Sequence, residues 1–228
     1  MSRFFRAGVF SRKEGISEAQ FGDHWFKVHG HLASFMPGLH RYLQNHIRER
    51  LFEVQPFPDH EVGGISQQWF DDVAAMERCE QSPEYAAVKR DIPNFQGAIT
   101  ILVLAGEPVF GTAPVPEQGR APGGPANKLL VLSRRRPAAP EGARPAQLAP
   151  AEGGPFAYVQ NTVVDSAHPV SANVPSGKVP VEAMAELFFD SEQGLRDWVV
   201  SPAGQIFIHR HPSYEPLAAY AVNAVRIM

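Results

Sequence analysis

Cysteine is almost missing from this chain of 228 residues, which contains Cys79 and no other. A disulfide within the chain is therefore impossible, and a reducing compartment is the natural one. No basic and apolar leader opens the sequence, and its longest apolar run, residues 99–105, is far shorter than the roughly 20 residues needed to span a bilayer. These absences predict a cytoplasmic protein that does not interact with membranes.

Positive charge is also scarce, with 21 Lys and Arg against 24 Asp and Glu. Only residues 134–136 place three arginines together, and we interpret them as a solvated strand end. Nucleic-acid recognition requires a basic surface, so no such partner is expected. The sequence also lacks a glycine-rich phosphate loop, a nucleophile elbow and a paired-cysteine motif. A small molecule remains the partner to consider.

The two halves of the chain repeat one plan, with several matches in the same order and at nearly the same spacing. The matched pairs are Tyr42 and Tyr158, Gln44 and Gln160, Asn45 and Asn161, Ser82 and Ser201, Pro83 and Pro202, and Pro93 and Pro212. Between the halves, residues 106–126 carry five glycines and five prolines, a composition typical of a linker. We therefore predict a first unit over 1–106, a linker over 107–126 and a second, diverged unit over 127–228.

The pattern of apolar and turn-forming residues gives each unit the same kind of elements. In the first half we expect strands at 3–10, 39–47, 62–70 and 98–104, with helices at about 18–36, 72–79 and from 83 onward. This β-α-β-β-α-β order is that of a ferredoxin-like unit. The second half predicts strands at 128–134, 156–164, 181–189 and 216–226 and a helix at 191–200, whereas its Pro-rich residues 137–155 leave room for a short helix at most.

Several motifs of the first half together resemble the EthD family of the dimeric α/β-barrel superfamily. The resemblance is carried by residues 21–32 (FGDHWFKVHGHL), 41–46 (RYLQNH), 69–72 (WFDD) and 82–85 (SPEY). In this family two sheets usually close into a barrel between subunits. The resemblance thus implies an α+β fold in which two ferredoxin-like units with antiparallel sheets form that barrel within one chain.

The resemblance also implies a functional expectation. The family places its pocket between the sheet and the helices of one unit, and it includes a cofactor-free isomerase of aromatic-compound catabolism. By this resemblance we expect a lyase or isomerase of aromatic or polyketide metabolism that uses no cofactor. Since family members dimerise, two tandem chains are expected to be able to pair as a homodimer.

Histidines are concentrated in the first unit, where six of the nine fall between positions 24 and 60. Histidine exchanges protons near neutral pH, so two in one pocket supply a base and an acid. On a regular helix His24 and His31 share an apolar face with Val28 and Phe35, which is expected to pack against the sheet, whereas His29 lies about 140° away from His24.

Strand alternation orders the residues around position 44. Tyr42, Gln44 and His46 point to one side of their strand and Asn45 to the other. The polar row meets the helical histidines if it faces the helices, and it meets the second unit if it faces the barrel interior. The second unit keeps the Tyr and Gln but has Thr162 in place of His46, which favours a specific role for His46.

These patterns predict a set of site residues. The predicted catalytic residues are His24, His29, Tyr42 and His46, with His29 or His46 as the base and Tyr42 as donor to an enolate oxygen. The predicted substrate-binding residues are Trp25, Gln44, Asn45, His60, Trp69 and Tyr85. No metal site is predicted, because the helical histidines lack the spacing of four that places two imidazoles on one face.

Three functions are consistent with the sequence. The first is a cofactor-independent enzyme that moves protons in an isomerisation, cyclisation, elimination or decarboxylation of a small aromatic, lactone or polyketide-like molecule. The second is non-catalytic binding of a hydrophobic ligand or haem in the barrel pocket. The third is a structural protein that builds assemblies, for which a filled fold without a cavity near His29 is expected.

Overall fold

A computed structural model describes residues 4–54, 60–139, 151–169 and 174–228. Its first unit contains β1 (Phe4–Arg12), α1 (Glu18–His24), a π turn (Trp25–His29), α2 (Gly30–Ala33), β2 (Arg41–Glu53), β3 (Gly64–Trp69), α3 (Val73–Glu80), α4 (Pro83–Asp91), a 3-10 turn (Ile92–Asn94) and β4 (Gln96–Phe110). Its second unit contains β5 (Lys128–Arg135), β6 (Ala157–Asp165), β7 (Ala183–Phe188), α5 (Glu192–Val200), α6 (Pro202–His209) and β8 (Tyr214–Arg226).

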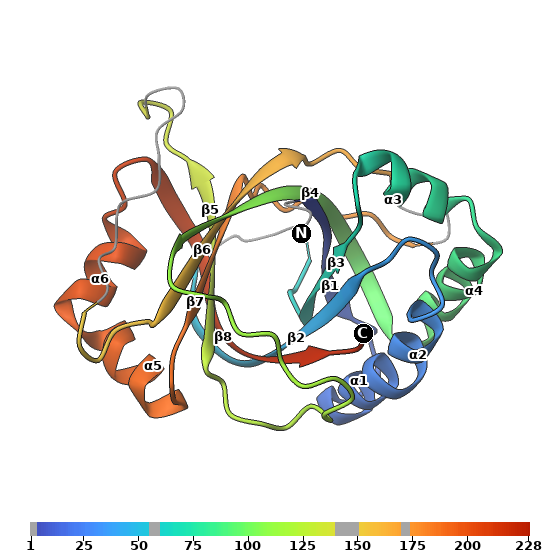
Figure 1. Ribbon diagram of the computed structural model, residues 1–228, viewed down its shortest axis with the longest axis horizontal. Helices are drawn as coiled ribbons and strands as arrows, with labels where there is room; N and C mark the ends of the chain where they lie inside the picture. Colours follow the sequence, from blue (N-terminus) through green and yellow to red (C-terminus); the bar gives the residue numbers. More distant parts are fainter. Residues whose placement is uncertain (1–3, 55–59, 140–150, 170–173) are drawn as a thin grey trace.

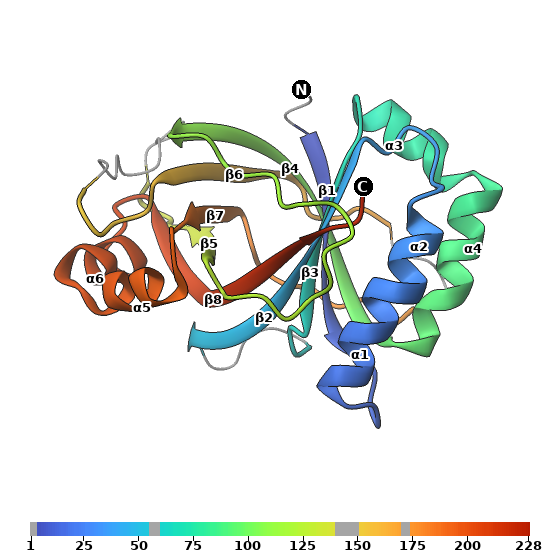
Figure 2. The ribbon, with the colours of Figure 1, turned by 60° about the horizontal axis from the view of Figure 1, so that its bottom comes forward.

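The strands form one closed barrel in the order β1-β3-β2-β8-β5-β7-β6-β4, and every pairing is antiparallel. Each unit contributes four neighbouring strands in the ferredoxin-like order, and the pairings β2–β8 and β4–β6 join the two sheets. Figure 1 shows α1 to α4 on one side of the barrel and α5 and α6 on the opposite side, and Figure 2 gives a second view of this arrangement. The predicted α+β fold and intrachain barrel are therefore confirmed.

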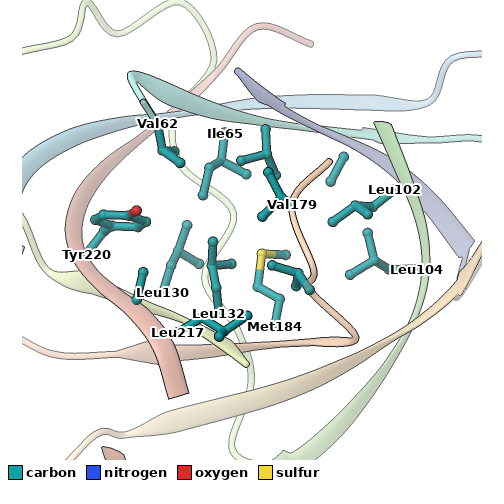
Figure 3. Packing of buried hydrophobic residues seen from close by; sticks show 14 of the residues in the cluster. Val62, Ile65, Leu102, Leu104, Leu130, Leu132, Val179, Met184, Leu217 and Tyr220 are labelled. Atoms are coloured by element: carbon teal, nitrogen blue, oxygen red, sulfur yellow. The ribbon is translucent and has the colours of Figure 1, made fainter. Parts of the chain in front are cut away.

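Apolar side chains from both units fill the barrel interior. Alternate residues of β1, such as Phe5, Ala7 and Val9, point inward and pack against Leu130 and Leu132 of β5. Figure 3 shows this cluster, which also includes Val62, Ile65, Leu102, Leu104, Val179, Met184, Leu217 and Tyr220. Because this core belongs to both sheets, neither unit buries its inner face without the other.

A buried ion pair lies among the inward-facing residues. Lys128 Nζ is 2.6 Å from Glu186 Oε2, and it also donates to Asn45 Oδ1 and Gln67 Oε1. The second oxygen of Glu186 accepts from Gln67 and from Asn161. Burial lowers the pKa of Lys128 and raises that of Glu186, but the attraction and hydrogen bonds between them hold the pKa of Glu186 below its usual value. The network ties the two sheets together across the barrel.

The observed elements follow the sequence pattern with a few differences. The paired Ser-Pro motifs begin helices in both units, since Ser82 accepts from the N–H of Tyr85 and Ser201 from that of Gly204. The second of these helices, α6, was not predicted. β4 continues to Phe110, into the range predicted as linker, because its last residues pair with β6. Residues 137–155 were predicted to hold a short helix at most, and residues 140–150 of this range lie outside the described part of the chain.

Within the described ranges, the structure contains no helix of the length and apolar character that crossing a membrane requires.

We predict that Lys128→Met destabilises the protein by about 3–5 kcal/mol, because Glu186 then remains buried without its counter-charge. The double variant Lys128→Met/Glu186→Gln should recover much of this loss. Arg196→Met is the matched control, since Arg196 pairs with Glu49 and Glu192 at an exposed site, where such pairs contribute about 1 kcal/mol or less. Urea unfolding measures all three, and equal losses for Lys128→Met and Arg196→Met would contradict this account of the core.

Candidate functional site

A cavity of about 50 Å³ lies between the sheet and the helices of the first unit. Its walls are formed by Arg6, Gly8, Phe10, Trp25, His29, Tyr42, Ser66, Gln68, Tyr85, Val88, Ile92, Gln96, Ile99, Ile101 and Val174. The sheet beneath it carries small residues where the helix side chains need room. A Cβ on Gly64, for example, would lie 2.6 Å from the Trp25 ring. Mostly apolar walls with a few polar groups are typical of small-molecule sites.

Two histidines share one carboxylate at this cavity. His24 Nε2 lies 2.8 Å from Asp91 Oδ1, and His29 Nδ1 lies 3.0 Å from Asp91 Oδ2. The π turn makes this possible, because in it the N–H of Gly30 bonds to the carbonyl of Trp25, five positions earlier. Residues five apart, such as His24 and His29, then lie on one face of the helix.

The expected separation of His24 and His29 was therefore wrong, since it assumed a regular helix throughout. The same turn changes which residues face the sheet. Val28 and Phe35 were predicted to pack against it, but they are 43% and 60% exposed. Trp25 and His29 are buried in their place. His31, which was placed on the same predicted face, is also exposed.

The protonation states of the cluster follow from its bonds. Burial raises the pKa of Asp91, but hydrogen bonds from His29, Asn94 and His24 outweigh it and lower the value to about 2. Burial lowers the pKa of His29 by more than Asp91 raises it. At neutral pH Asp91 is an anion and His29 is neutral, so the Nδ1–H of His29 donates to the carboxylate. Nε2, on the other edge of the ring, then carries a free lone pair.

Asp91 was missed by the sequence analysis as a partner of the histidines. The two aspartates of the WFDD motif do not take this place, since Asp72 caps α3 and Asp71 pairs with His40 on the surface. One signal was available, because Asp91 is the last residue of α4. A carboxylate is disfavoured at a helix C-terminus by the helix dipole, so its presence there calls for another reason.

Tyr42 contributes a hydroxyl group to the cavity wall. Its oxygen accepts from Trp25 Nε1 at 2.9 Å and from Gln44 Nε2 at 3.3 Å. Burial raises the pKa of Tyr42 to about 12, so the phenol keeps its proton. With two donors pointing at its oxygen, Tyr42 is arranged to donate that proton in a further hydrogen bond.

Arg6 and Gln96 supply the remaining polar wall. Arg6 donates to Gln68, Glu80 and the hydroxyl of Tyr85, so its guanidinium is held in place by neighbours. Gln96 differs, because its buried Nε2 has no hydrogen-bond partner among the described residues. A buried donor without a partner costs free energy, which makes Gln96 a place where a ligand oxygen would be favoured.

His46 lies outside the cavity, although the polar row of β2 does face the helices. Its Nε2 is 3.1 Å from Gln44 Oε1. The centroid of its ring lies 4.5 Å from that of the Trp25 ring, so His46 packs against Trp25. On its other side it faces a surface groove beside Gly22 and Asp23. Burial and the nearby Arg48 lower the pKa of His46 to about 4, so it stays neutral.

The other predicted site residues divide between the cavity and elsewhere. Trp25 and Tyr85 line the cavity, and Gln44 lies directly behind Tyr42. Asn45 points into the barrel, where it binds Lys128. Trp69 stacks on Phe5 and under Arg41, away from the cavity. His60 bonds to Thr100 on the neighbouring strand.

Across the described residues, no group of three or more His, Cys, Asp or Glu side chains is placed to hold a metal ion.

Comparison with known proteins gives a family match and a fold match. The EthD domain model matches residues 13–97, a range that includes His24, His29 and Asp91. No curated protein matches the chain in sequence.

Several solved structures share the fold of the entire chain. An anthrone oxidase-like protein is 11% identical, with 100% of this chain and 94% of the other covered and a TM-score of 0.59. A putative monooxygenase from Lactobacillus acidophilus is 12% identical over 100% and 95% of the two chains, with a TM-score of 0.51. A putative monooxygenase from Fusobacterium nucleatum is 9% identical over 97% and 93%, with a TM-score of 0.53.

At these identities the solved structures establish the fold alone, and the family match covers the first unit. The first unit is therefore similar to the EthD domain over residues 13–97, and it stands in a tandem of ferredoxin-like units that closes one barrel within a single polypeptide.

Proposed function

We propose that the first-unit cavity catalyses proton transfer on a small, mostly apolar molecule, with His29 as the base. The observation that carries the proposal is the neutral His29 held by the ionised Asp91 at the cavity wall. A base of this kind acts in an isomerisation, cyclisation, elimination or decarboxylation of an aromatic, lactone or polyketide-like substrate, and we propose a reaction of this class without an added cofactor. The fold neighbours described as anthrone oxidase-like and monooxygenase are consistent with small-molecule chemistry in such barrels.

The proton follows a defined route. His29 Nε2 removes a proton from a carbon next to a carbonyl group, the C–H electron pair forms the C=C bond of an enolate, and the π pair of the carbonyl group moves onto its oxygen. The imidazolium that forms is stabilised by Asp91, which already accepts the Nδ1–H. His24 bonds to the other oxygen of Asp91 and so fixes the carboxylate in the orientation that His29 needs.

The developing oxygen anion requires hydrogen-bond donors. Tyr42 keeps its proton at neutral pH and lines the same cavity, and Gln96 Nε2 is buried without a partner. Donors that are already oriented stabilise charge in the transition state without reorganisation. Arg6 adds positive charge at the wall while its N–H groups remain bound to neighbours. This donor set assigns Tyr42 and Gln96 to the substrate oxygen.

His46 takes a supporting place in this proposal. It donates to Gln44, which in turn donates to Tyr42, so His46 acts on the site through two side chains rather than directly. The proposal is thus narrower than the predicted set, with His29 alone as base. Pairing of two tandem chains as a homodimer remains a prediction beside it.

The first test follows hydrogen exchange in D2O, which requires no knowledge of the natural substrate. Indan-2-one is a flat ketone whose protons next to the carbonyl are acidic, and the wild-type protein should accelerate their exchange, measured by proton NMR. His29→Gln should lower the catalysed rate about 100-fold, the lower range for a lost general base. His31→Gln is the matched control, since His31 is exposed on the same helix.

An equal rate in the wild-type protein and His29→Gln would rule out His29 as the base. Binding of the ketone without any catalysed exchange in the wild-type protein would instead favour the non-catalytic ligand-binding function.

The second test is the pH dependence of the same exchange. Since the base form of His29 is required and its pKa is lowered, the rate should rise to a plateau with a midpoint below 6.5, the value of an unperturbed histidine. Asp91→Asn removes the charge that raises the pKa of His29, so the midpoint should move to still lower pH and the plateau should fall about tenfold or more. His40→Gln, which alters the exposed pair with Asp71, should leave the profile unchanged. A wild-type midpoint at or above that of a free histidine would contradict the assignment.

A further inference from the structure

One residue of the second unit forms part of the first-unit cavity. Val174 is 7% exposed and packs with Phe10, Trp25, Ile99 and Ile101. Among the described residues, every other one that lines the cavity belongs to the first unit. In Figure 1 the connection between β6 and β7 extends to the side of the barrel that carries α3 and α4. The second unit thus reaches over the barrel rim to complete the wall.

Backbone hydrogen bonds hold Val174 in this position. The N–H of Ile99 donates to the carbonyl of Pro175, and the N–H of Gly177 donates to the carbonyl of Ile99, both at 2.9 Å. This short bridge sets residues 174–177 beside β4, directly at the cavity. Gly177 also allows close contact with His60, because a Cβ there would lie 2.0 Å from the His60 ring.

A second anchor lies before this segment. His168 Nε2 is 2.8 Å from Glu80 Oε1, and the same carboxylate binds Arg6 at 2.6 Å. Arg6 is itself a wall residue of the cavity. The connection between β6 and β7 is therefore attached to the first unit at two places, both of them next to the cavity.

The size of the cavity gives this contact a consequence. Its volume of about 50 Å³ is well below the roughly 150 Å³ of an apolar cavity that binds benzene. A ligand that contains a ring therefore fits only if a residue of the cavity wall moves aside. The wall residues of β1 and β3 are fixed by strand pairing on both sides, and Ile99 and Ile101 of β4 pair with β1. Val174 instead belongs to an irregular segment that is joined to Ile99 by backbone hydrogen bonds. Val174 is therefore a wall residue that strand pairing does not fix.

We infer that Val174 is a specificity-determining residue, through which the second unit sets the size of the molecule that the first unit accepts. This inference rests on the proposed function, because it concerns the same cavity. It assigns the ligand class as a compact ring compound with one acceptor oxygen, with Gln96 Nε2 at the oxygen and Val174 at the apolar end.

The test uses three ketones that share one head group: cyclopentanone, indan-2-one and benz[f]indan-2-one, with one, two and three fused rings. Dissociation constants are measured by NMR from the indole N–H signal of Trp25, a cavity residue, assigned with Trp69→Phe and Trp198→Phe. Val174→Ala should improve the binding of benz[f]indan-2-one relative to cyclopentanone by about tenfold or more, the effect of small changes in pocket size on discrimination. Val174→Phe should weaken the binding of indan-2-one by a similar factor. Val164→Ala is the control, since Val164 is 54% exposed on β6.

The outcomes separate this inference from the proposed chemistry. If thermal melting shows that Val174→Ala is folded, and this variant keeps the wild-type ratio of affinities, the inference is overturned, whatever the result for Val174→Phe. If the ratio shifts but no variant catalyses exchange, the size limit stands and the proton-transfer proposal fails. If no ketone binds to the wild-type protein or to Val174→Ala, both are overturned.

Discussion

The pairings of β2 with β8 and of β4 with β6 are the constraint on which the other features of this molecule depend. Without them each four-stranded sheet would have two open edges and an apolar inner face in water, which natural proteins avoid. The pairings remove the edges and bury that face in one shared core. Because they join two units of one chain rather than two identical subunits, the sequences on either side were free to diverge. The side of the second sheet that faces α5 and α6 is filled by Tyr158, Trp198 and Phe207, whereas the corresponding side of the first unit retains a cavity.

The buried ion pair depends on the same freedom. Lys128 pairs with Phe188 as Phe5 pairs with Trp69, so Lys128 occupies the position of Phe5 in the repeat. Glu186 in turn stands where the first unit has Gln67. In a barrel of two identical subunits, a lysine at this position would appear twice and face a second glutamate. In the tandem it appears once, and its three protons are matched by two amide oxygens of the first unit, on Asn45 and Gln67, and by the carboxylate of Glu186. A buried charge is tolerated only when it is paired and hydrogen-bonded in this way.

The sequence was sufficient for the fold and for part of the site. Period-two alternation placed Tyr42, Gln44 and His46 on one face of β2, and the Ser-Pro motif of the first unit marked the start of α4, because both signals are local. The helix was harder, since a single π turn changes the face on which every later residue lies. His24 and His29 therefore met at a carboxylate that the regular helical spacing did not indicate. Val174 carried no signal at all, because its place in the cavity depends on the path of a connection between two strands of the other unit.

Three features of the cavity are unfavourable for the local structure that contains them. The π turn replaces regular helical hydrogen bonds, Asp91 places a negative charge at the end of α4, and Gln96 buries a donor without a partner. Each has a cost, and packing alone would be satisfied by a regular helix, an uncharged residue and an apolar side chain. Their convergence on one small space is the pattern expected where a sequence is selected for chemistry at the expense of stability. The second unit shows the comparison directly, because it has the same strands and an apolar core at the equivalent position. The fold therefore does not require the His24–His29–Asp91 cluster, and the proton transfer proposed above is an explanation that accounts for all three features together.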